Sequence, residues 1–139
     1  MRYAIEFSDD DNGTVLVTCP DLPEVTSFGD DEDDARLRAV EAVETALQGR
    51  ISDRAEIPLP VAEGPDFVAL PALTAAKVAL YRTMLQRGMR KADLARLTGA
   101  KPMQVDRLLD LSHASRLDQI EAALRALGKE IAIEVRDAA

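Results

Sequence analysis

The stretch MRKADLARLTGAKPMQVDRLL, residues 89–109, decides what the C-terminal half of the chain is expected to form. A first short helix is expected from Lys91, with the small side chain of Ala95 facing a second helix that crosses it closely. Gly99 suits the turn between them, because a residue without Cβ adopts positive φ at little cost. Pro102 suits the first turn of the second helix, where its missing N–H would be unpaired anyway. The spacing predicts two short helices joined by a tight turn.

The second of these helices has distinct inward and outward faces. Val105 and Leu108 form the inward pair, and Met103 and Arg107 occupy the opposite direction. In a helix-turn-helix of the Xre/Cro type the second helix enters the major groove, where arginine pairs with guanine and apolar side chains contact thymine methyl groups. The predicted DNA-contacting residues are Lys91, Lys101, Met103, Gln104 and Arg107. The alternative interpretation is a short helical bundle that only packs.

The net charge of −8 is divided unevenly along the chain. Residues 1–66 hold 17 acidic and 5 basic side chains, a net charge of −12, whereas residues 67–139 hold 8 acidic and 12 basic side chains, a net charge of +4. Charge asymmetry of this size suggests modules with different partners. Two domains are predicted, residues 1–72 and 73–139, with the DNA-binding segment in the basic one.

The acidic half shows the alternation of a small sheet followed by a helix. Strands are expected at residues 3–7, 14–19, 25–28 and 67–70, the last returning to the first sheet. Asn12-Gly13 suits the turn of a hairpin. The acidic run at residues 30–34 favours the start of a helix, capped by Asp30 or Asp31. That helix is expected to end near Gln48, with Gly49 as its stop. The predicted fold class is α+β.

The basic half is expected to be helical apart from its end. Thr74 is predicted to cap a helix to about Arg87, and Ser115 to cap another over residues 116–127. Residues 130–135 alternate like a strand that has no partner in its own domain. A two-fold strand pair is the expected use, because a single recognition helix makes few base contacts. The predicted dimerisation residues are Ile131, Ile133 and Val135.

Several functional classes are disfavoured by what the sequence lacks. The single cysteine, Cys19, cannot form an internal disulfide, which is typical of a reducing cytoplasm. No apolar run approaches the length of a membrane span, and no signal peptide is recognisable. A calcium loop from Asp9 would need Glu where Pro20 stands. His113, the only histidine, suits a phosphate contact or a packed loop better than catalysis. No nucleophile set, P-loop or dinucleotide motif occurs, so no enzyme, metal or cofactor is expected.

The order of motifs resembles one family, the HicB antitoxins that end in a helix-turn-helix. The resemblance is carried by CPDLPEVTSFGDD (residues 19–31), EIPLP (56–60), DLARLTG (93–99), HASRLD (113–118) and LGK (127–129). The chain departs from the usual pattern at Glu24, where a small residue often stands, and at Asp31, where Thr is usual. Both positions belong to a turn or a helix cap.

The resemblance implies a partial RNase H-like βββαβ domain without the metal-binding carboxylates of the nuclease. It also implies a partner, the small basic HicA toxin, an mRNA interferase, and repression of the operon by binding operator DNA as an even-numbered homo-oligomer. An N-terminal module with a net charge of −12 suits a cationic partner. The residues expected to contact toxin are Asp9, Asp10, Asp11, Asp21 and Glu24. Two alternatives stay open: a stand-alone regulator with a ligand-sensing N-terminal domain, and a ribonuclease-like enzyme that uses the acidic residues.

Overall fold

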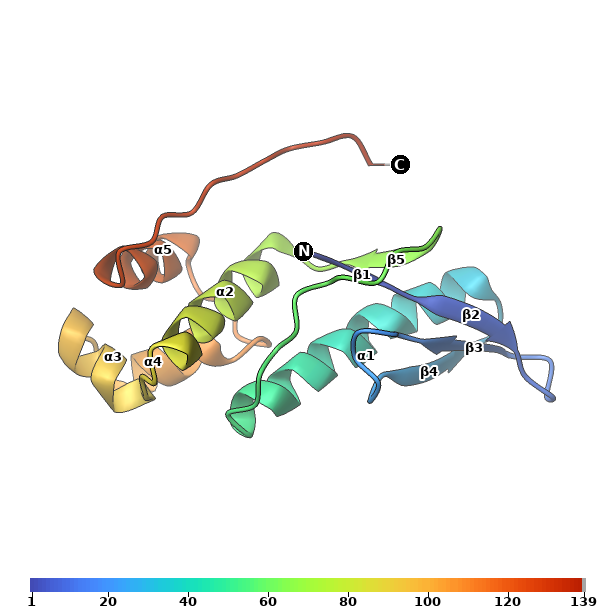
Figure 1. Ribbon diagram of the computed structural model, residues 1–139, viewed down its shortest axis with the longest axis horizontal. Coiled ribbons are helices and arrows are strands. Elements are labelled where there is room, and N and C mark those ends of the chain that lie inside the picture. The colour runs from blue at the N-terminus through green and yellow to red at the C-terminus, as the bar shows by residue number, and fades with distance from the viewer. Residues whose placement is uncertain (139) are drawn as a thin grey trace. The chain divides into compact units, whose positions relative to one another are not determined.

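The structure, a computed structural model, describes residues 1–138 and contains five short strands and five helices in this part of the chain (Figure 1). The fold is therefore mixed α+β, as the sequence predicts. It divides into two compact units, Met1–Ala75 and Ala76–Ala139. The two units are described separately below.

The first unit contains two small antiparallel sheets. One sheet has the order β2-β3-β4, and the other pairs β1 with β5. The strands are β1 (Arg2–Ala4), β2 (Glu6–Asp9), β3 (Val15–Thr18), β4 (Thr26–Gly29) and β5 (Phe67–Ala69). The pairing of Tyr3 with Val68 confirms that the late strand returns to the first one. The expected single strand at residues 3–7 is interrupted at Ile5, whose backbone N–H instead donates to the Asp66 carbonyl at 3.0 Å.

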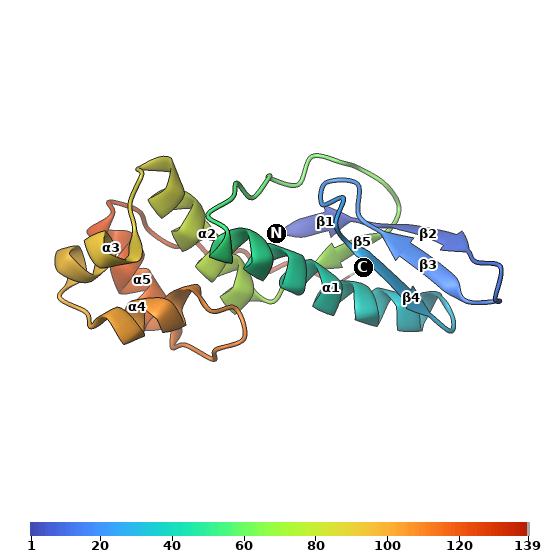
Figure 2. The same ribbon diagram turned by 90° about the horizontal axis from the view of Figure 1, so that it is seen from below.

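The core of this unit lies between β2-β3-β4 and helix α1 (Glu32–Ser52), which lies along one face of the sheet (Figure 2). The helix buries one side chain for each turn against the sheet. These residues are Ala35, Ala39, Val43, Leu47 and Ile51. The prediction that Gly49 ends the helix is wrong, because burial of Ile51 at 5% exposure favours a further turn beyond the glycine. The chain leaves the helix after Asp53, the C-cap, through Arg54 at φ 55°.

The second unit is built from α2 (Ala72–Gln86), whose first turn precedes the division between units, α3 (Lys91–Thr98), α4 (Pro102–Leu109) and α5 (Leu117–Ala126). Two predicted caps are wrong. Thr74 lies inside the first turn of α2, where the Ala75 N–H donates to the Pro71 carbonyl. Ser115 does not cap α5, whose N-cap is Arg116, because the Ser115 hydroxyl is engaged in a buried network described below.

The predicted C-terminal strand is not formed within one copy, and the two-fold pairing expected for it stays a prediction. Within the described residues, the segment after α5 forms no strand, and Ile133 and Val135 are 74% and 90% exposed. A strand is held by hydrogen bonds to a neighbouring strand. Among residues 1–138 of one copy no strand pairs with this segment, so its alternating pattern forms no ladder there.

Candidate functional site

The two short helices of the quoted stretch form through local signals that the structure makes explicit. Gly99 ends α3 at φ 73°, with its N–H donating to the Ala95 carbonyl at 2.9 Å. The backbone N–H of Lys101 donates to the side-chain carbonyl of Gln104 at 3.0 Å, which satisfies one donor at the start of α4. Pro102 occupies the first helical turn. The turn therefore holds α4 in a defined direction after α3.

The faces of α4 are those that the spacing predicts. Val105 and Leu108 are buried at 0% and 7% exposure, while Met103 is 63% exposed. Gln104 and Arg107 are exposed on the same helix, and Lys101 is exposed at its N-cap. The structure thus places three of the five predicted DNA-contacting residues on the exposed side of α4 and a fourth at its N-cap.

Lys91, the fifth residue, lies at the start of α3 and its Nζ pairs with the Asp106 carboxylate at 2.9 Å. The pair is more than half exposed on both sides, so water and salt weaken it strongly. Gln104 uses its carbonyl oxygen as a cap and keeps its amide N–H groups for another partner. Neither arrangement was visible in the sequence pattern.

A buried lysine of α2, whose side chain reaches the C-terminal end of α4, is a feature that the sequence pattern did not predict. Lys77 is fully buried, and its Nζ donates to the backbone carbonyls of Arg107, Asp110 and His113 at 2.8, 2.6 and 2.7 Å. The Ser115 hydroxyl lies 2.9 Å from the same nitrogen. Burial lowers the pKa of Lys77, which the nearby carboxylate of Asp110 opposes. The ammonium group ties α2 to the C-terminal end of α4 and to the loop that follows.

The position of Lys77 in the sequence held a signal for its burial, although not for its partners. It stands three residues after Thr74 and four before Tyr81, both of them buried, on a helix with a continuous buried face. A cation near the last carbonyls of a helix is also favourable, because these groups carry partial negative charge. The predicted loop role of His113 fits its contacts, since its Nδ1 lies 3.0 Å from the Ser115 hydroxyl.

A groove of about 640 Å³ lies beside this network within the second unit. It is lined by the end of α3, by α4 and by α5, with Leu97 and Ala126 among its apolar residues and Gln104, Arg107 and Arg116 among its polar ones. Arg107 therefore borders both the exposed face of α4 and this groove.

The predicted toxin-contacting residues do not form one cluster. Asp9, Asp10 and Asp11 lie at the tip of the β2–β3 hairpin, whereas Asp21 and Glu24 lie in the β3–β4 connection, at the other end of these strands. The hairpin tip is closed by the Gly13 N–H, which donates to the Asp10 carbonyl, and Gly13 has φ 77°. The structure thus separates the expected contact residues into two groups.

The two acids of the β3–β4 connection have structural partners. The Asp21 carboxylate accepts hydrogen bonds from the backbone N–H groups of Val61 and Ala62 at 3.1 and 3.0 Å, which holds the long segment before β5. Glu24 forms a two-pronged pair with Arg50, with nitrogen–oxygen distances of 2.6 and 2.9 Å. The Arg50 guanidinium lowers the pKa of Glu24. These contacts assign both acids a role in holding the unit together.

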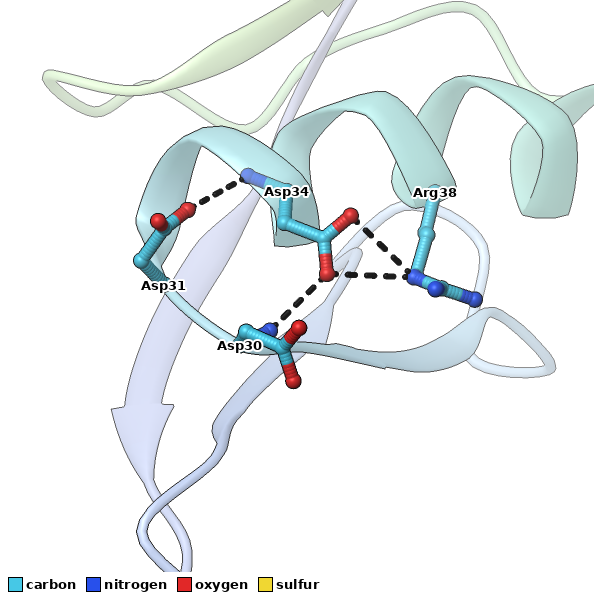
Figure 3. A network of polar contacts seen from close by, with 4 residues as sticks. All are labelled: Asp30, Asp31, Asp34 and Arg38. Carbon is cyan, nitrogen blue, oxygen red and sulfur yellow. Dashed lines mark hydrogen bonds and ion pairs between the residues drawn. The ribbon is translucent and has the colours of Figure 1, made fainter.

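The acidic run at the start of α1 acts as a helix cap (Figure 3). The Asp31 carboxylate accepts from the Asp34 N–H at 2.8 Å, and the Asp34 carboxylate accepts from the Asp30 N–H at 2.9 Å. The pKa of Asp34 is lowered, first by this backbone hydrogen bond and then by Arg38. The predicted capping role of Asp31 is confirmed. Within residues 1–138, no group of three or more potential metal ligands is assembled.

Cys19 is buried in the same unit, and burial raises the pKa of its thiol. A thiol held in this state is a poor nucleophile, because the reactive form is the thiolate. Cys19 therefore behaves as a small core residue. None of the helices in the described part of the chain is long and apolar enough to cross a membrane.

Comparison with known proteins places these observations in a family. Residues 2–79 match the model of the HicB-like antitoxin of bacterial toxin–antitoxin systems. The chain is 43% identical to "Antitoxin HicB 2" of Photorhabdus laumondii over 94% of each chain, and 42% identical to "Antitoxin HicB" of Pseudomonas fluorescens over 99% of this chain and 96% of that one. It is 32% identical to "Antitoxin HicB" of Escherichia coli over 96% and 98% of the two chains. The chain therefore belongs to the HicB-like antitoxins of bacterial toxin–antitoxin systems, and is a regulatory protein rather than an enzyme.

Proposed function

We propose that this antitoxin neutralises a small basic toxin of the HicA type through its first unit and represses its own operon through its second. In this proposal α3 and α4 act as a helix-turn-helix, and α4 enters the major groove. Operator binding requires two or more copies, because one short helix contacts few bases. The acidic unit attracts the cationic toxin and speeds its association.

The observation that supports the proposal is that the acidic and the basic parts of the sequence fall into different structural units. All 17 acidic side chains of residues 1–66 belong to the unit Met1–Ala75, and the unit that follows has a net charge of +4. The exposed face of α4, with Met103 and Arg107, belongs to that basic unit. A polyanion such as DNA and a cationic toxin therefore suit different units of the same chain.

Replacing Arg107 by Ala is expected to weaken operator binding and spare toxin neutralisation. A guanidinium that pairs with a guanine edge contributes about 1–3 kcal/mol for each half-site, and a dimer loses this twice. Operator affinity is measured by gel shift at fixed salt concentration, and neutralisation by rescue of growth when the toxin is co-expressed.

The control is Arg125→Ala, which removes the same charge from an exposed position on α5, where Arg125 pairs with Glu121. Equal loss of operator affinity in both variants would show that only bulk charge matters. Loss of toxin rescue in a folded Arg107→Ala protein would contradict the division of labour between the units.

A second test concerns assembly through residues 130–135. Replacing Ile133 and Val135 by Asp is expected to yield a monomer and to reduce operator affinity by at least about tenfold, because apolar side chains on one face of a strand pair stabilise it. Mass measurement by light scattering and gel shift report the two effects. Ala132→Asp, on the opposite face of the alternation, serves as the control. Dimers that persist in the Ile133 and Val135 variant would exclude this segment as the contact.

A further inference from the structure

We propose that the outer face of the β2-β3-β4 sheet, centred on Phe28 and Leu16, is the surface that holds the cationic toxin. The inference rests on the proposed neutralisation of a basic toxin and specifies where it occurs. We call this surface the outer sheet face. It comprises the outward-pointing residues of the three strands: Glu6, Ser8, Leu16, Thr18, Thr26 and Phe28.

The strand register defines the outer sheet face. Side chains alternate along a strand, so Leu16 and Phe28, which are partners in the register, point to one side, and Val17 and Ser27 point to the other. Val17 is fully buried on the side that α1 covers. Phe28 is 47% exposed on the opposite side. Since α1 is the only helix that lies wholly within the first unit, it leaves the outer sheet face without a covering helix.

Acidic side chains gather at the end of the β2-β3-β4 sheet where β2 turns into β3, at the rim of the outer sheet face; by alternation, Asp9 itself lies on the side of Val17. The pairing of Val15 with Gly29 places the β2–β3 tip beside the chain that leads from β4 into α1. Asp9 and Asp11 belong to this tip, and Glu32 begins α1. Within residues 1–138, their three carboxylates make no hydrogen bond or ion pair. They differ in this from Asp21 and Glu24, which hold other parts of the unit.

The charge of the unit decides between two possible occupants of the outer sheet face. A second copy would bring another acidic unit of net charge −12 against the same face, and like charges repel. A cationic protein gains complementary charge at the rim while it buries Phe28 and Leu16. An aromatic centre with a charged, solvent-exposed rim is the usual arrangement of a protein interface. The occupant is therefore the basic toxin.

The test measures association and dissociation rates between the full chain and a small basic toxin of the HicA type, in a nuclease-inactive form. Phe28→Ala is expected to dissociate at least about tenfold faster, as truncation of a central aromatic residue does. Replacing Asp9 and Asp11 by Asn is expected to slow association several-fold and to flatten its dependence on salt, with little change in dissociation. Leu37→Ala is the control, because Leu37 is an apolar side chain 70% exposed on α1.

Four outcomes would overturn the inference. Wild-type kinetics in a folded Phe28→Ala protein would exclude the outer sheet face, and so would an equal loss in Leu37→Ala. A fall in the mass of the free antitoxin on Phe28→Ala would show that a second copy occupies this face instead. If the wild-type chain does not bind the basic protein at all, the proposed function fails with the inference, whereas binding that is insensitive to Phe28 defeats the inference alone.

Discussion

Replacing Lys77 by Met is expected to remove about 3–5 kcal/mol from the free energy of unfolding of the second unit. Charge-assisted hydrogen bonds of about 1.5–3 kcal/mol each are lost, and relief of the cost of burying the ammonium group offsets part of that loss. Methionine retains most of the aliphatic stem, so the loss is mainly polar. Three backbone carbonyls at the end of α4 and in the next loop would lose the ammonium donor, and each would keep the backbone N–H that it already accepts within its turn. A unit of this size is stabilised by only about 3–10 kcal/mol. The variant should therefore leave α4 partly unfolded under conditions in which the wild-type unit is folded.

Hydrogen exchange measured by mass spectrometry on peptides from α4 and residues 110–115 reports this local unfolding, and peptides from the first unit report that unit separately. Exchange in the first unit should remain unchanged. Arg87→Met is the matched control, because it also removes one positive charge, but from an exposed position just after α2. A change of less than about 1 kcal/mol in Lys77→Met would mean that water replaces the ammonium group without loss. Operator binding should fall in Lys77→Met and persist in Arg87→Met.

Val105 and Lys77 show which features of the second unit can be predicted from sequence patterns and which cannot. The inward position of Val105 follows from its spacing to Leu108, and the turn at Gly99 follows from the chemistry of glycine, so both are local properties of the chain. Lysine, in contrast, is usually a surface residue, and nothing near Lys77 in sequence announces three carbonyls that lie 30 or more residues away. The same distance hid the role of Ser115, which is a good helix cap by type but is drawn into the lysine network.

The acidic unit shows a similar limit. The strand pairings and the cap at Asp31 follow from alternation and from helix-start preferences. The sequence pattern predicts that Asp21 and Glu24 are solvent-exposed acids. In the structure both carboxylates are bound by groups of the same unit, which lie 40 and 26 residues away in the sequence. The C-terminal segment is a different case, since a strand that requires a second copy cannot be formed by one chain. Local chemistry therefore predicts elements better than it predicts which polar side chains remain available for a partner.

Replacing Gly29 by Ala is expected to destabilise the first unit by at least about 3 kcal/mol, at the upper end of overpacking effects. An added Cβ would lie 2.2 Å from the Ala35 nitrogen and 2.6 Å from its Cα. These are backbone atoms of α1, so no flexible side chain can move aside, and the start of the helix must shift away from β4. Because Phe28 precedes Gly29 on this strand, the shift should also impair toxin binding.

Urea unfolding of the full chain measures the loss, and Gly49→Ala supplies an internal comparison of opposite sign. Gly49 lies within α1 and an added Cβ there meets nothing within 4 Å, so alanine should stabilise the helix by about 0.5–1 kcal/mol. The two substitutions add the same methyl group to the same unit and differ only in what that group contacts. If Gly29→Ala unfolds within about 1 kcal/mol of the wild type, the close approach of α1 to β4 is not what holds them together, and the outer sheet face must be positioned by other contacts.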